Sequence, residues 1–138
     1  MIHANVFGVL YCTHAALPLM RDQGTGHIVN VSSVAGRIAR LGSGVYNLTK
    51  FGVGAFSESL RQEAVAIGVR VTTIEPGAVA TELPAHNRPE IQDQMRQAFA
   101  GVTPLSSEDI AHAIVYAIAQ PSNVSLNEVL VRPSGQVR

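Results

Sequence analysis

The chain has 138 residues, a length that suits one domain with a single core. Ten Lys and Arg residues balance ten Asp and Glu residues without a block of either sign, so the charge pattern disfavours nucleic acid and an anionic membrane surface as partners. Hydrophobic residues make up 46% of the chain, which excludes a disordered polypeptide.

The first predicted element is a buried helix over residues 2–20. Its apolar and small residues recur at three- and four-residue steps, and Pro18 and Gly24 lie near or past its predicted end. The run lacks a basic n-region and is interrupted by Asn5 and His14, so we expect neither a signal peptide nor a membrane span. The helical spacing is carried by Ile2, Val6, Val9, Leu10, Thr13, Ala16 and Leu17.

Two runs rich in β-branched residues follow, and each predicts a buried parallel strand. The first is HIVNVSS, residues 27–33, and the second is VRVTTIEPG, residues 69–77, which closes with a Pro-Gly pair. Between them, a glycine-containing loop leads into a predicted helix from about Ser43 to Ala66. Gly68 is its stop signal.

The last third of the chain begins with an irregular segment, residues 78–90, and a modest helical pattern that ends near Phe99. The stretch SSEDIAHAIVYAIAQ, residues 106–120, starts with a serine cap and an acidic first turn, so it predicts a helix that Pro121 stops. LNEVLVRP, residues 126–133, supplies a third strand. The alternation of helices and strands predicts an α/β fold with a parallel sheet, in one domain.

The cysteine and histidine content bears on metals and on the cellular setting. Cys12 is the only cysteine, which excludes an internal disulfide and a cysteine-rich zinc site and favours a reducing, cytoplasmic setting. The five histidines never fall three or four residues apart, so the spacing of helical metal ligands is absent. We therefore predict no metal site.

The stretch VYNLTKFG, residues 45–52, places Tyr46 and Lys50 on one face of a predicted helix. A nearby ammonium favours the phenolate by charge attraction, so the pair could act as an acid and base, although for the pair taken alone an amphipathic helix with an exposed lysine is the preferred explanation. Ser33 ends the first predicted strand, where α/β enzymes place reactive groups, and could equally be a loop or cap serine. The strand-end hydroxyl of Ser33 and the phenol of Tyr46 could then meet one substrate oxygen.

Several motifs in this order resemble the catalytic half of a short-chain dehydrogenase/reductase. They are ANVFG (4–8), IVNVSSVAG (28–36), YNLTK (46–50), IEPGAVATEL (74–83) and NEVLVRPSGQ (127–136), and they extend over essentially the whole chain. Two positions depart from the family pattern: Leu48 stands where a small residue is usual, and His3 where an acidic or small residue is common. The resemblance implies a partial NAD(P)-binding Rossmann-fold domain over residues 1–138.

The resemblance also implies roles for four residues. Tyr46 would be the general acid and base, and Lys50 would bind the nicotinamide ribose and favour the phenolate. Ser33 would hydrogen-bond the substrate oxygen, and Asn5 would hold a water that connects Lys50 to solvent. These four residues form the predicted catalytic set.

The Pro-Gly segment after the second strand matches a family motif that packs on the nicotinamide and binds its carboxamide. By itself this segment could be a simple turn. With Tyr46 and Lys50, the predicted cofactor contacts are Pro76, Gly77, Val79 and Thr81. The expected cofactor is NAD or NADP. The NEVLVRPSGQ ending favours NADP, because it is similar to a branch of NADP-dependent 3-hydroxy acid and serine dehydrogenases.

The family's glycine-rich turn, which receives the cofactor pyrophosphate, does not occur in these 138 residues. The expected fold is therefore the C-terminal half of a doubly wound Rossmann-type parallel sheet, with the N-terminal βαβ units missing. The implied substrate is a small alcohol or carbonyl compound, and the implied full-length form is a homodimer or homotetramer. A cofactor-incompetent remnant serving as an interaction module stays open, as does an extended-type epimerase or dehydratase sharing the Tyr-Lys motif.

Overall fold

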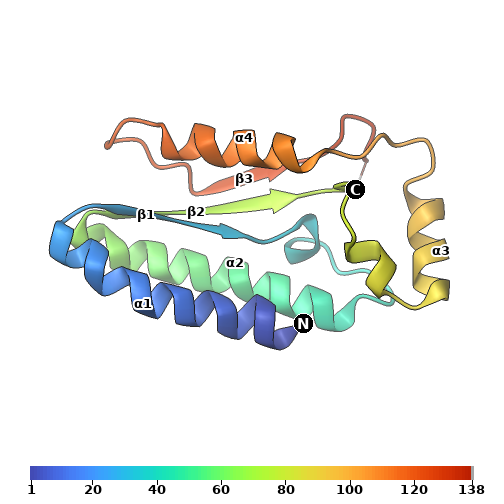
Figure 1. Cartoon of the computed structure of the whole chain (residues 1–138), viewed down its shortest axis with the longest axis horizontal. Helices are drawn as coiled ribbons and strands as arrows, with labels where there is room; N and C mark the ends of the chain where they lie inside the picture. The colour runs from blue at the N-terminus through green and yellow to red at the C-terminus, as the bar shows by residue number, and fades with distance from the viewer. Residues whose placement is uncertain (138) are drawn as a thin grey trace.

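Three parallel strands form the sheet at the centre of the molecule (Figure 1). The computed structural model describes residues 1–137, with His86 described by its backbone alone. The strand order is β1-β2-β3, so β2 is central and hydrogen-bonds to both neighbours. The strands are β1 (Gly26–Val31), β2 (Val69–Pro76) and β3 (Glu128–Val131).

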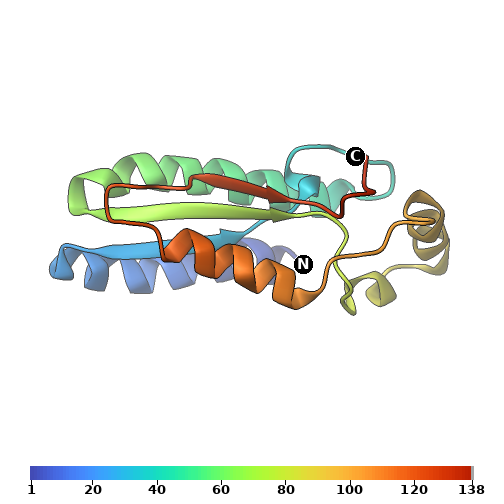
Figure 2. The same ribbon diagram turned by 90° about the horizontal axis from the view of Figure 1, so that it is seen from above.

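Helices cover both faces of this sheet (Figures 1 and 2). Two helices, α1 and α2, pack on one face, α4 packs on the other, and α3 stands beyond the carboxyl ends of the strands. This arrangement confirms the predicted α/β fold, a three-stranded part of a Rossmann-type sheet. The helices are α1 (Gly8–Gln23), α2 (Gly44–Ala64), α3 (Pro89–Ala98) and α4 (Ser107–Ile118), with a π-helical turn η1 (His3–Phe7) and 3₁₀ turns η2 (Val34–Gly36), η3 (Val65–Ile67) and η4 (Leu83–His86).

All three strands end at one edge of the sheet, called the carboxyl edge below. Val31 at the end of β1 is in register with Ile74, and Pro76 at the end of β2 is in register with Val131. Because the strands are parallel, the segments that follow β1 and β2 leave the sheet on the same side. The fold therefore brings Ser33 and the Pro76–Gly77 turn to one place.

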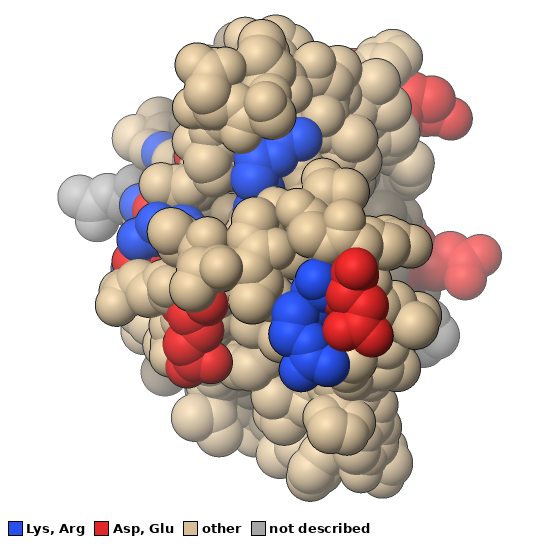
Figure 3. Space-filling view, turned by 90° about the vertical axis from the view of Figure 1, so that its left-hand side faces the viewer, with Lys and Arg blue, Asp and Glu red and all other residues tan. Residues whose placement is uncertain are grey.

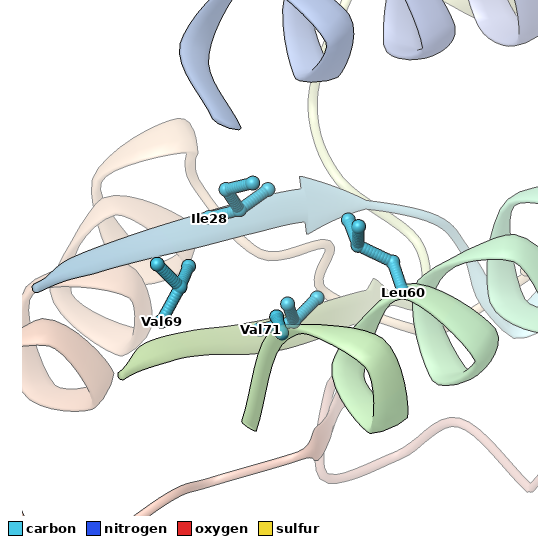
Figure 4. Packing of buried hydrophobic residues seen from close by; sticks show 5 residues of the cluster. Ile28, Leu60, Val69 and Val71 are labelled. Carbon is cyan, nitrogen blue, oxygen red and sulfur yellow. The ribbon is translucent and has the colours of Figure 1, made fainter. Parts of the chain in front are cut away.

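The core lies between the α1–α2 layer and the strands β1 and β2. Ile28, Val69 and Val71 on the strands and Leu60 on α2 lie together in this layer (Figure 4), and each is buried. Removing such a side chain from water contributes roughly 1.5–3 kcal/mol of stability. The same cluster contains Ala64, and the partly buried side chains packed around it are Leu17, Met20, Phe56 and Ile67.

The helical segments end at Gly24 and Gly68, and Pro18 does not end the first helix. The first helix continues past Pro18 to Gln23, so the predicted end near residue 20 is wrong; Gly24 ends it with φ +68°. Gly68, with φ +70°, stops the turn after α2 as predicted. A Cβ on Gly68 would lie 2.6 Å from the backbone oxygen of Gly24, so both its φ and its surroundings require glycine.

The surface is sparsely charged. On the face at the amino ends of the strands, Lys and Arg lie scattered among uncharged residues and near acidic side chains, without a field of one sign (Figure 3). Along the part of the chain that the structure describes, no helix is both long and apolar enough to cross a bilayer. Several large apolar side chains are nevertheless exposed on η1, α1 and α2: Phe7, Leu10, Tyr11, Val45, Leu48 and Phe51.

His27, at the amino end of β1, is held by a hydrogen bond to β2. Its Nε2 lies 2.7 Å from the Thr72 hydroxyl, which itself donates to the carbonyl oxygen of Leu126 at 2.6 Å. The hydroxyl must therefore accept from His27, so Nε2 carries the proton. The other ring nitrogen, Nδ1, is buried without a hydrogen-bond partner among the described residues. Burial, and then the neighbouring Arg70 charge, lower the pKa of His27 from 6.5.

We expect the lowered pKa of His27 to make the fold less stable in mild acid. The unfolded histidine binds a proton near its ordinary pKa of 6.5, whereas the folded ring resists it, so stability present above that pH is lost as the pH falls toward the folded pKa. Urea unfolding between about pH 8 and about pH 5 measures this slope. His27→Gln should flatten it, whereas His14→Gln on exposed α1 should not; equal slopes would contradict the assignment.

Candidate active site

The carboxyl edge gathers most of the predicted site residues. Ser33 follows β1, and its hydroxyl donates to the carbonyl oxygen of Pro76 at 3.4 Å, which links the ends of β1 and β2. Gly77 extends the sheet pairing by donating its amide to Val131 at 2.7 Å. The first turns of α2, which carry Tyr46, lie at the same end of the molecule (Figure 1). The site is therefore built from three separate segments.

Tyr46 and Lys50 lie on one face of α2, as predicted. The Lys50 ammonium is 5.7 Å from the centre of the Tyr46 ring and donates to the carbonyl oxygen of Val31 at 3.0 Å. Burial lowers the pKa of Lys50. Among the described residues, none hydrogen-bonds the Tyr46 hydroxyl. A strand end thus anchors the ammonium beside a phenol that remains open to a ligand.

Lys50 is also the only lysine of the chain, because the other nine basic residues are arginines. Lysine carries a compact ammonium that arginine does not reproduce. The single lysine therefore coincides with the one position where the family resemblance assigns an ammonium.

The structure shows Ser33 as a cap serine and places it at the end of β1. It is the N-cap of η2, since its hydroxyl oxygen accepts from the amide of Ala35 at 3.1 Å. It also stands half-buried at the carboxyl edge, with only a long bond from its hydroxyl to Pro76. The capping bond fixes the oxygen, and the weakly held proton can turn toward another acceptor.

Asn5 lies in η1 and reaches α2 through a residue that the sequence analysis did not single out. Its amide donates to the Thr49 hydroxyl at 3.2 Å, and Thr49 donates to the carbonyl oxygen of Tyr46 at 2.8 Å. Thr49 is fully buried. The structure therefore connects Asn5 to the backbone of Tyr46, and no hydrogen bond between the side chains of Asn5 and Lys50 occurs among the described residues.

The predicted cofactor segment is held by the C-terminal end of the chain. The Gln136 side-chain oxygen accepts from the amide of Ala78 at 2.9 Å, and a Cβ on Gly77 would lie 2.3 Å from it. Val79 pairs with Leu105 in an isolated parallel bridge. Thr81 is exposed, and its hydroxyl accepts from the amide of Leu83 at 3.4 Å. Pro76, Gly77 and Val79 are thus fixed in place, whereas Thr81 lies at the rim.

A charged group that the sequence analysis missed lies beside this segment. Arg37 pairs with Glu75 at 2.6 Å and also with Glu128, so it joins the loop after Ser33 to β2 and β3. The Glu75 side chain is only 6% exposed. The sequence did contain a signal for this pair, because Glu75 is an acidic residue immediately before Pro76 and Gly77 in a chain with few charges.

The residues present fit the nicotinamide end of a dinucleotide. An ammonium and a phenol on one helix face can bond the two hydroxyls of a ribose, and the Gly77 turn is held rigidly beside them. The glycine-rich pyrophosphate turn is absent from the sequence. Within the described part of the chain, no group of three or more His, Cys, Asp or Glu residues could hold a metal ion.

Comparison with known proteins decides the family. Residues 1–92, two thirds of the chain, match the sequence profile described as short chain dehydrogenase. The chain belongs to the short chain dehydrogenase family. An uncharacterized oxidoreductase of Staphylococcus saprophyticus is 43% identical over 99% of this chain and 56% of that protein.

Solved structures of short chain dehydrogenases have the same fold. The closed form of a serine dehydrogenase complexed with NADP⁺ is 33% identical, with a TM-score of 0.82 over 95% of this chain and 53% of that one. A serine dehydrogenase from Escherichia coli is 32% identical, with a TM-score of 0.74 over 92% of this chain and 49% of that one. This short chain dehydrogenase sequence therefore spans about half the length of the relatives that it matches.

Proposed function

We propose that the chain is the catalytic half of an NAD(P)-dependent oxidoreductase that interconverts an alcohol and a carbonyl compound. The observation that carries this proposal is the Tyr46–Lys50 pair at the carboxyl edge, with the ammonium 5.7 Å from the phenol ring and bonded to the end of β1. Ser33 stands at the same edge, bonded to Pro76. This set combines an acid, a cation and a hydrogen-bond donor.

In the proposed reaction, Tyr46 handles the proton of the substrate oxygen. The phenol donates to the oxygen during carbonyl reduction and accepts from it during alcohol oxidation. Lys50 stabilises the phenolate through its nearby positive charge. Ser33 donates to the same substrate oxygen by exchanging its long bond to Pro76 for a shorter one. A nicotinamide held by these residues would supply or accept the hydride.

Asn5 supports this site from η1, which packs against α2. Its side chain, bonded to Thr49, lies next to the turn that carries Tyr46. In the proposed site, Asn5 holds a water that returns protons from solvent to Lys50. Pro76, Gly77, Val79 and Thr81 line the nicotinamide, with Gln136 fixing the turn.

The proposed cofactor is NADP, and the proposed substrates are hydroxy acids or similar small alcohols. The likeness to a serine dehydrogenase complexed with NADP⁺, at 33% identity, supports both choices. The exposed apolar residues of η1, α1 and α2 support a homodimer or homotetramer, because contiguous apolar surface favours association. We propose a cytoplasmic setting for this enzyme, without a membrane or nucleic-acid partner.

A fluorescence titration with NADPH tests the proposal. We expect binding in the micromolar range, with NADH weaker, and a loss of affinity in the Lys50→Met variant. Oxidation of NADPH should follow when 3-oxo acids or related ketones are added. No binding at millimolar NADPH would reject the proposal for this polypeptide and favour the alternative, a cofactor-incompetent interaction module.

A further inference from the structure

One loop at the site is held by a residue that the proposed chemistry does not use. Residues 33–40 leave β1, carry Ser33 at their start, and run along the first turns of α2. Asn47, the neighbour of Tyr46 in the sequence, is 5% exposed and points into this loop. It connects the two residues that must meet one substrate oxygen.

The Asn47 side chain uses its hydrogen-bonding groups on this loop. Its Nδ2 donates to the carbonyl oxygens of Ala35 at 2.7 Å and Ile38 at 2.9 Å. Its Oδ1 accepts from the amide of Arg40 at 3.3 Å. Two backbone carbonyls and one backbone N–H therefore bond to one buried side chain. Only a side-chain carboxamide, not a carboxylate, can donate to both carbonyls and also accept from the N–H.

The same loop packs closely on α2 one turn further along the helix. The Ser32 hydroxyl donates to the carbonyl oxygen of Lys50 at 3.0 Å. A Cβ on Gly36 would lie 2.9 Å from that oxygen, so the two backbones approach as closely as glycine allows. The Asn47 contacts, the Ser32 contact at the start of the loop and the Arg37 ion pairs to Glu75 and Glu128 together hold the loop in place.

We propose that Asn47 is a positioning residue that sets the Ser33 hydroxyl relative to the Tyr46 phenol. Its partner Ala35 is also the residue whose amide donates to the Ser33 hydroxyl oxygen at 3.1 Å, so one short segment links the Asn47 side chain to Ser33. Displacing the loop by about 1 Å is enough to lower turnover about 10²-fold in a positioned site. The catalytic consequence rests on the proposed function, whereas the geometric coupling does not.

The sharpest variant is Asn47→Asp, which has nearly the same shape. At neutral pH its carboxylate would face two carbonyl oxygens, whereas at low pH the protonated form could again donate to one of them. Asn30→Ala is the matched control, because Asn30 is equally buried at 8% exposure and its amide donates to Ser57 at 2.9 Å, on the sheet side of α2. Asn47→Ser is the milder second variant if Asn47→Asp does not fold.

Amide NMR of the full chain gives a readout that does not need turnover. We expect Asn47→Asp to shift the Ala35 amide resonance and to speed its hydrogen exchange at neutral pH, with recovery toward wild type in acid. Asn30→Ala should leave that resonance in place. An unchanged Ala35 amide in the Asn47 variants would overturn the proposal, whether or not the wild-type chain oxidises NADPH.

Kinetics then test the catalytic consequence where turnover is present. We expect Asn47→Asp to lower kcat about 10²-fold at neutral pH while the Kd for NADPH changes little. Asn30→Ala should lose stability and keep kcat. Equal losses of kcat in the two variants would identify Asn47 as a residue of general stability and overturn the positioning role.

Discussion

Tyr46→Phe should lower kcat about 10²- to 10⁴-fold, the usual contribution of one acid–base group, and weaken NADPH binding by no more than about tenfold, the loss of one hydrogen bond. The substitution removes a single hydroxyl, and no described residue hydrogen-bonds that hydroxyl, so the fold loses no hydrogen bond among the described residues. Stopped-flow absorbance of NADPH with a ketone substrate measures the effect. Because the ring is kept, the Lys50 ammonium retains its aromatic neighbour.

Two comparisons make this prediction specific. Tyr116→Phe, on exposed α4, should retain full activity. A Tyr46→Phe, Lys50→Met double variant should be little worse than Tyr46→Phe in kcat, because groups that act as a unit give non-additive losses. If Tyr46→Phe retained more than about a tenth of wild-type kcat, another group would be the proton donor.

Arg37→Met should destabilise the folded chain by about 2 kcal/mol, the largest loss of stability that we expect from a surface-accessible side chain. The Glu75 side chain is 6% exposed, and its partner Arg37 is 38% exposed. Removing the arginine leaves a buried carboxylate without its counter-charge. Fully buried pairs lose about 3–5 kcal/mol, and the partial exposure of Arg37 to water reduces that figure.

Urea unfolding at one fixed protein concentration measures this loss, since any association would shift the midpoint. Glu128→Gln is the control. The Glu128 carboxylate also pairs with Arg37, but its side chain is 56% exposed, so this variant should lose no more than about 1 kcal/mol of unfolding free energy. Removing both charges, in Arg37→Met with Glu75→Leu, should restore part of the stability. Similar losses in Arg37→Met and Glu128→Gln would show that the burial of Glu75 does not matter.

Local patterns predicted most of the fold. β-Branched runs located β1 and β2 to within a few residues, and the serine with its acidic first turn located α4, where Ser106 and Asp109 form a reciprocal capping box. The third strand is shorter than the predicted residues 126–133, since β3 covers only Glu128–Val131. Pairing with one neighbour decides where an edge strand ends, and this information is not local.

The candidate site also has a part that local sequence patterns predict and a part that they do not. Tyr46 and Lys50 share a helix face through local spacing, so the sequence was sufficient to pair them. Thr49, Asn47 and Glu75 went unnoticed because their roles depend on partners in other segments: Thr49 meets η1, Asn47 meets the loop after β1, and Glu75 meets Arg37. Spacing along a helix or strand carries no information about such partners.

The single lysine has a practical consequence. Reagents that modify amines have one side-chain target in this sequence, Lys50, in addition to the α-amino group of the chain. A label attached there would report on the site and block it in the same reaction, because it removes the charge beside Tyr46. The exposed thiol of Cys12 on α1 offers a second, chemically distinct handle. A probe on that thiol could follow binding while the amine stays unmodified.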